Sequence, residues 1–270
     1  MIKISAFADE ISSDLEIQVQ NLIANGVSYI ELRGVWDKNV MDLSEEEIRA
    51  IKQYADDYGI GFSAIGSPLG KFPVDGDFSL QMEGLKKALH YAQILEAPYI
   101  RIFSFYIPEG ESPASYRSQV LDWLGQMIAE AENTPVILAH ENEKGIYGDT
   151  GERCLDLCTT LNSPAFTGVF DFANFVQCGQ RPYADCWLKL RPYISYFHIK
   201  DALRRTGRVV PAGHGDGNVA KILGEAFAVG FNSFLTLEPH LSVAAASYGR
   251  TTPELFRTAS QALQAILAEI

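Results

Sequence analysis

The sequence predicts a single-domain α/β protein folded as a (β/α)8 (TIM) barrel. Strand-like and helix-like segments alternate along the chain, and the strands are short and mostly apolar, as expected for parallel strands covered on both faces. The length of 270 residues matches one eightfold barrel. No linker or low-complexity stretch indicates a second domain, so residues 1–270 are expected to form the barrel. The expected strands are 2–7, 29–32, 61–65, 99–103, 136–140, 166–170, 194–199 and 234–237.

The segments between these strands carry helix signals. Ser44 and Glu47 form a capping box, in which the Ser hydroxyl accepts from an early amide and the Glu side chain reaches back. Gly59 and Gly230 offer left-handed stops before the next strands. Residues 253–270 are expected to form the last helix, with one apolar stripe. The stripe consists of Leu255, Ala259, Leu263 and Ile266.

A doubly wound open sheet is the competing topology. Such a sheet commonly carries Gly-x-Gly-x-x-Gly after its first strand, whereas residues 6–10 read Ala-Phe-Ala-Asp-Glu. The barrel is therefore preferred. The longest irregular stretch, residues 201–218, follows the seventh strand, where a loop of the catalytic face of a barrel would lie.

Composition narrows the class of partner. The net charge is −12, and no Lys/Arg-rich run is present, so a nucleic-acid partner is disfavoured. Neither a secretory signal pattern nor an apolar run of 18 residues occurs, which predicts a soluble, cytoplasmic protein without a membrane partner. The four cysteines follow no C-x2-C pattern, and free thiols fit a reducing compartment.

Four acid or imidazole residues close four consecutive expected strands. They are Glu141, Asp171, His198 and Glu238. A single acidic residue at a strand end is usually a helix cap or a solvated charge. In a barrel, however, the carboxyl ends of the strands converge on one face, so these four side chains become neighbours. Three carboxylates and one imidazole suit a hard divalent cation, which predicts a metal enzyme.

The segments around these residues resemble the xylose isomerase-like barrel superfamily, also called the sugar phosphate isomerase/epimerase or AP endonuclease 2 family. The similar segments are 140–147, 170–174, 197–201 and 237–240. The resemblance covers essentially the whole chain and implies the barrel. It also implies one divalent cation on the four residues, with Mn²⁺ favoured and Mg²⁺, Co²⁺ or Zn²⁺ as the other candidates.

The resemblance implies proton-transfer chemistry on a small carbohydrate or polyol. A cation on two adjacent substrate oxygens acidifies the C–H between them and stabilises an enediolate. Glu141 and Glu238 would serve as base and acid. The expected activity is that of a sugar or sugar phosphate isomerase or epimerase. A dehydratase of an inosose- or dehydroshikimate-like keto compound is the first alternative, and a non-catalytic sugar-binding barrel is the second.

Substrate-contact positions of the ketose 3-epimerases are only partly matched. Arg204 lies six residues after the metal His, as in those enzymes, but Asn174 and Tyr147 stand where they have His and Glu. These differences count against a tagatose- or psicose-type 3-epimerase. Asn174 and Arg204 remain expected substrate contacts.

Two further residues are candidates for substrate binding. His214 lies in the glycine-rich stretch 211–218, which either contacts substrate or simply turns, with Asn218 capping the next helix. Lys71 follows the third strand, and a solvated loop lysine is the alternative.

Other charged residues near strand ends are open to more than one interpretation. Glu31 and Arg33 either form internal ion pairs at the barrel mouth or bind substrate, and the direction of Lys200 is ambiguous. A three-metal nuclease is disfavoured because the third and fourth strands end without His. Family members are often dimers or tetramers, so a homo-oligomer stays open.

Overall fold

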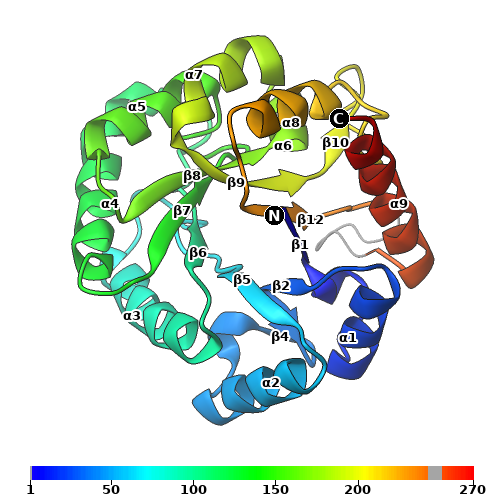
Figure 1. Cartoon of the computed structure of the whole chain (residues 1–270). Helices are drawn as coiled ribbons and strands as arrows, with labels where there is room; N and C mark the ends of the chain where they lie inside the picture. Colours follow the sequence, from blue (N-terminus) through cyan, green and yellow to red (C-terminus); the bar gives the residue numbers. More distant parts are fainter. Residues whose placement is uncertain (1, 243–250) are drawn as a thin grey trace.

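Eight parallel strands close into a barrel in the computed structural model, which describes residues 2–242 and 251–270 (Figure 1). Around the ring the order is β1-β12-β9-β8-β7-β6-β5-β2. The predicted fold class is thus confirmed. The barrel strands are β1 (Lys3–Ala6), β2 (Tyr29–Leu32), β5 (Gly61–Ile65), β6 (Tyr99–Ile102), β7 (Ile137–Glu141), β8 (Phe166–Asp171), β9 (Ile194–Ile199) and β12 (Phe234–Leu237).

Helices surround the ring of strands on the outside (Figure 1). In the described part of the chain, no helix is both long and apolar enough to span a membrane. The α-helices are α1 (Leu15–Ala24), α2 (Glu45–Asp57), α3 (Phe78–Leu95), α4 (Arg117–Ala131), α5 (Gly151–Leu161), α6 (Phe172–Gln177), α7 (Leu188–Leu190), α8 (Val219–Ala228) and α9 (Pro253–Glu269). Short hairpin strands at the barrel mouth are β3 (Gly34–Val35), β4 (Lys38–Asn39), β10 (Asp201–Ala202) and β11 (Val209–Val210).

Local sequence signals set several of these boundaries. The capping box at Ser44 and Glu47 is present at the start of α2, with both reciprocal hydrogen bonds. Gly59 and Gly230 have φ values of 69° and 90°, which glycine adopts without the cost that a Cβ adds. These predicted starts and stops are confirmed.

The buried stripe of α9 differs by one position from the prediction. Ala259, Leu263 and Ile266 are buried as expected, but Leu255 is only half-buried, and Phe256 is fully buried instead. Spacings of three and four residues starting from Phe256 keep the stripe on one face of a helix with 3.6 residues per turn. The first turn therefore packs through its aromatic residue.

Side chains alternate between the two faces of each strand, so the barrel interior has its own apolar cluster. A buried cluster inside the ring contains Ala64, Ala139, Val169, Tyr196 and Phe234, separate from the larger core between strands and helices. Successive residues of a strand face opposite sides, so residues two further along face the same interior. The same rule directs the polar ends of these strands into the barrel mouth.

His140 faces the opposite way from Glu141, as the alternation predicts. It is buried, and its Nε2 lies 2.9 Å from Ser104 Oγ. Burial lowers the pKa of His140 from 6.5 to about 4. The folded protein therefore binds this proton more weakly than the unfolded chain does.

The stability that His140 contributes is present above pH 6.5 and lost as the pH falls towards 4. We expect the free energy of unfolding of the His140→Gln variant to fall less between pH 7 and pH 5, by about 2 kcal/mol, than that of the unchanged protein. Urea unfolding at both pH values measures this difference. Equal pH dependence in the His140→Gln variant and the unchanged protein would contradict the assignment.

Candidate metal centre

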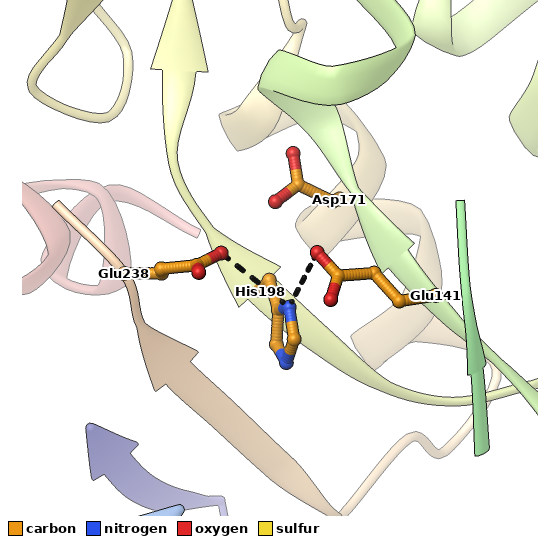
Figure 2. A group of neighbouring side chains, drawn as sticks. All are labelled: Glu141, Asp171, His198 and Glu238. Carbon is orange, nitrogen blue, oxygen red and sulfur yellow. Dashed lines mark ion pairs between the residues drawn. The ribbon is translucent and has the colours of Figure 1, made fainter. Parts of the chain in front are cut away.

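Four strand ends bring three carboxylates and one imidazole to one point in the barrel mouth. Glu141 ends β7, Asp171 ends β8, His198 lies in β9 and Glu238 follows β12. Figure 2 shows their side chains gathered together, and one ligand atom of each lies within 4.8 Å of the others. Each of the four residues has at most 3% of its surface exposed. The residues that the sequence selects thus share one buried site.

The donor atoms converge on a common centre rather than on each other. His198 Nδ1 lies 3.1 Å from Glu141 Oε1 and 3.6 Å from Glu238 Oε2. Within residues 2–242 and 251–270, however, Nδ1 has no aligned hydrogen-bond partner. Donors at about 2.0–2.1 Å from one tetrahedral ion lie roughly 3.3 Å apart. The spacing and the buried, unpaired nitrogen therefore fit a divalent cation.

An arginine holds the outer oxygen of each flanking glutamate. Arg101 Nη1 donates to Glu141 Oε2 at 3.2 Å, and Arg33 Nη1 donates to Glu238 Oε1 at 3.2 Å. The ring of Phe7 lies against both guanidinium groups, with its centre 4.5 Å from Arg33 Cζ and 5.1 Å from Arg101 Cζ. Charge-assisted hydrogen bonds of this kind fix orientation. Each glutamate therefore offers one oxygen to the centre.

Lys200 places a buried ammonium group against two of the four residues. Its Nζ lies 2.9 Å from Asp171 Oδ2 and 2.9 Å from Glu238 Oε2. Lys200 follows the end of β9, but it keeps the alternation and faces the same side as His198. The direction that the sequence left ambiguous is inward. Lys200 therefore partly balances the charge of the carboxylates.

Burial and neighbouring charges move the pKa values of the cluster in opposite directions. Burial raises the pKa of Asp171 to about 7, against the attraction of Lys200. Burial would also raise the pKa of Glu141, but attraction to His198 helps to lower it to about 2. Burial would lower the pKa of His198, yet Glu141 and Glu31 raise it to about 10. In the absence of a cation, the site thus keeps an imidazolium among its carboxylates.

Asn174 supports two of the candidate ligands. Its backbone N–H donates to Asp171 Oδ1 at 2.7 Å, so Asp171 also caps α6. Its side-chain Nδ2 donates to Glu141 Oε1 at 3.1 Å and to Asn142 O at 2.9 Å. Asn174 is 3% exposed. The structure therefore places this predicted substrate contact directly against two candidate ligand side chains.

The other predicted substrate contacts lie further out. Lys71 Nζ pairs with Glu143 Oε2 at 2.8 Å, close beyond the end of β7. Arg204 is exposed, and its Nη2 donates to Gln180 O at 2.7 Å rather than to the four residues. His214 is exposed in its loop, where its N–H donates to Pro211 O. Their substrate contacts stay predictions.

The glycine-rich loop at 211–218 folds around the carboxylate of Asp201. The N–H groups of Gly213, Gly215 and Gly217 donate to it at 3.0, 2.9 and 2.9 Å. A Cβ at Gly215 would lie 2.3 Å from Asp201 Oδ1. Asn218 precedes α8, but its side chain makes no capping hydrogen bond. Asn218 therefore occupies the expected N-cap position without capping the helix through its side chain. Its backbone is left-handed, with φ of 58°.

A second group of side chains adjoins Glu238. His240 Nε2 lies 3.1 Å from Glu10 Oε1 and 3.3 Å from Glu238 Oε1. Arg33 Nη2 lies 3.7 Å from Glu10 Oε1 and already supplies positive charge there. We interpret this group as an ion-pair network that fixes the outer oxygen of Glu238.

Arg101 is not among the residues predicted from the sequence, and the role of Glu31 is left open there. Each is a charged residue in an otherwise apolar strand, as in Tyr-Ile-Arg-Ile of β6 and Tyr-Ile-Glu-Leu of β2. The two-residue period places both on the side of the inward tyrosines. An isolated charge at an inward position was therefore the available signal. Glu31 and Arg33 do form internal ion pairs, but with His198, Asp9 and Glu238 rather than with each other.

Comparison with protein families fits this architecture. A family model described as xylose isomerase-like TIM barrel matches residues 19–265. The chain belongs to this family. A search of curated proteins finds no matching relative.

Solved structures with the same fold match nearly the whole length of this chain. The IolI protein with a bound zinc atom is 17% identical, with a TM-score of 0.79, over 99% of this chain and 98% of its own. The probable 3-DHS dehydratase AsbF of Bacillus anthracis is 19% identical, with a TM-score of 0.76, over 97% and 98%. A D-tagatose 3-epimerase-like protein is 17% identical, with a TM-score of 0.76, over 99% and 97%. At these identities the likeness shows the fold alone.

We expect Gly215→Ala to lower the free energy of unfolding by about 2 kcal/mol, because the added Cβ would collide with Asp201 and the backbone of Ala202. Thermal and urea unfolding measure the loss. Gly125 in α4 is the matched control, since a Cβ there meets nothing within 4 Å. Gly125→Ala should raise stability by about 0.5–1 kcal/mol. A Gly215→Ala variant as stable as the unchanged protein would show that the cradle around Asp201 is not tight.

Proposed function

We propose that this protein is a divalent-metal-dependent isomerase or epimerase of a small carbohydrate or polyol. The observation that carries the proposal is the buried convergence of Glu141, Asp171, His198 and Glu238 on one centre. A barrel mouth lined by charged and hydrogen-bonding side chains suits a substrate rich in hydroxyl groups. Membership in the xylose isomerase-like family supports an enzyme of this kind.

The four residues would hold one cation. Their oxygen-rich donor set favours Mn²⁺, with Mg²⁺, Co²⁺ and Zn²⁺ as alternatives. When bound, such an ion supplies Lewis acidity that stabilises negative charge on substrate oxygens. Arg101 and Arg33 keep Glu141 and Glu238 oriented with one oxygen inward.

Glu141 and Glu238 are the residues we assign to proton transfer. They flank the centre from β7 and from the end of β12, so a substrate carbon between them has a carboxylate on each side. Their arginine partners favour the ionised form, in which each carboxylate is able to accept a proton. A carboxylate held in this way is a weak base, and it returns the proton readily to another carbon or face. That shuttle is what isomerisation and epimerisation require.

A dehydratase is the second candidate, and Lys200 is the observation that favours it. Expulsion of a β-hydroxyl group needs a proton donor beside the leaving oxygen. The Lys200 ammonium is 4% exposed and reaches the same centre through Asp171 and Glu238. Burial would lower its pKa, but the carboxylates around it raise the pKa well above the usual value. Lys200 therefore stays protonated, as a donor must.

Metal content is the first test of the proposal. After chelation and reloading with Mn²⁺, we expect about one ion per chain by elemental mass spectrometry. Asp171→Asn should lose the ion because it removes a charged donor. Asp185→Asn is the matched control, since Asp185 pairs with Arg181 on the surface, and it should keep the ion. No ion in the unchanged protein would contradict the proposal, and three ions would favour a nuclease-type site.

Proton transfer is tested by exchange of substrate C–H with solvent deuterium, followed by NMR across a panel of keto sugars and inososes. We expect Glu238→Gln to slow turnover by about 100-fold or more, because the amide cannot accept the proton. Lys200→Met should abolish dehydration but spare C–H exchange if the second candidate holds. Metal content measured in parallel separates a lost ion from a lost base. Turnover at the original rate in Glu238→Gln would remove this residue from the mechanism.

A further inference from the structure

Glu31 is a carboxylate buried inside the barrel, on the far side of His198 from the metal centre. It belongs to β2 and is 0% exposed. Its Oε2 lies 3.2 Å from His198 Nε2, and Tyr196 OH donates to its Oε1 at 3.1 Å. Within the residues that the structure describes, no lysine or arginine pairs with Glu31. The His198 imidazole is therefore the group that is able to bring positive charge beside Glu31.

A buried carboxylate needs compensation that a phenol alone does not provide. Removing an ionised carboxylate from water costs several kcal/mol unless charge and hydrogen bonds replace the lost hydration. Tyr196 contributes a neutral hydrogen bond. Among the residues that the structure describes, positive charge reaches Glu31 only through His198, either as a second proton on the ring or as a cation on the other ring nitrogen.

The two nitrogens of His198 face different surroundings. Nδ1 faces Glu141 and Glu238 in the centre, whereas Nε2 faces Glu31. When a cation displaces the proton from Nδ1, the carboxylate beside Nε2 favours the remaining proton on that nitrogen, so the lone pair of Nδ1 is directed at the cation. An edge-on contact with Phe7, at 5.1 Å between ring centres, limits rotation of the imidazole. With a cation bound, the ring would therefore be fixed in position as well as in tautomer.

The strand pairing is irregular beside this residue, because β5 carries one extra residue, Ser63, between the partners of Ile30 and Glu31. The register between β2 and β5 shifts between Ile30 and Glu31. Such bulges re-aim a side chain and often lie beside functional sites. Tyr29, two residues earlier, packs on the interior cluster, so Glu31 continues the inward face at the level of His198.

We propose that Glu31 is a positioning residue for the metal centre, which holds His198 with its proton on Nε2 so that Nδ1 binds the ion. The inference rests on the proposed function, since it requires a cation on the four residues. It makes tight metal binding depend on a residue that is not one of the four proposed ligands, because all four remain when Glu31 is changed. Loss of its charge should weaken metal binding without removing a ligand.

The experiment measures metal affinity in metal-stripped protein by calorimetric titration with Mn²⁺. We expect Glu31→Gln, which is nearly isosteric, to bind Mn²⁺ about 10- to 100-fold more weakly than the unchanged protein. Glu143→Gln is the matched control, because Glu143 lies at the same mouth and pairs with Lys71 instead of a ligand. It should bind as tightly as the unchanged protein. Unfolding curves of the metal-stripped variants establish that each is folded.

A second measurement needs no variant. In zinc-loaded protein labelled with ¹⁵N, long-range proton–nitrogen NMR should show one histidine ring with zinc on Nδ1 and a proton on Nε2. Zinc on Nε2 of that ring would overturn the inference even if Glu31→Gln did not fold. Equal affinity of Glu31→Gln and the unchanged protein would overturn it while leaving the metal centre intact. Absence of binding by the unchanged protein would overturn the proposed function and this inference together.

Discussion

Buried negative charge at the mouth of the barrel is the constraint on which the rest of the structure depends. Among the described residues, carboxylates that are almost completely buried outnumber the lysine and arginine side chains that contact them. Burial of such groups is costly unless each is paired and hydrogen-bonded. The carboxylates are Glu10, Glu31, Glu141, Asp171, Asp201 and Glu238, and the cations are Arg33, Arg101 and Lys200. The fold thus creates a place that a divalent cation would stabilise.

Inside the barrel, the apolar and the charged side chains occupy different levels along the inward faces of the strands. Towards the amino ends of the strands, Tyr29, Tyr99 and Phe234 pack ring against ring. Towards the carboxyl ends, the same inward faces carry the ionised groups. Phe7 lies in the charged layer, against the guanidinium groups of Arg33 and Arg101 and the ring of His198. An apolar floor below the charged layer excludes water from it, which strengthens the electrostatic interactions there.

The sequence was sufficient for the barrel and for the four candidate ligands because both depend on one regularity. Short apolar strands end in a polar residue, and closure of the barrel brings those ends together. The partners of the ligands were harder to predict. The pairing of Arg101 with Glu141 joins neighbouring strands, and that of Glu31 with His198 spans 167 residues of sequence. Such pairs follow from strand order and register, which a single sequence does not contain.

The glycine-rich loop shows the opposite limit. Its composition predicted either a turn or a substrate contact. The structure shows a different reason for the glycines. Three of them bring backbone N–H groups to Asp201, where a side chain on Gly215 would not fit. A glycine-rich motif at the barrel mouth is therefore not itself evidence of substrate binding.

Asp171 links the candidate metal centre to the outer layer of the barrel. One oxygen accepts the N–H of Asn174 and so caps α6, while the other faces the Lys200 ammonium. Asn174 in turn donates to Glu141, so the first turn of α6 joins two candidate ligands from neighbouring strands. Asn is as good a cap as Asp, since its side-chain oxygen accepts the same hydrogen bond. Replacing Asp171 with Asn thus keeps the acceptor that starts the helix, while an amide NH2 takes the place of the oxygen that faces the Lys200 ammonium. A lost ion in that variant therefore reports on coordination where its unfolding curve shows that it is folded.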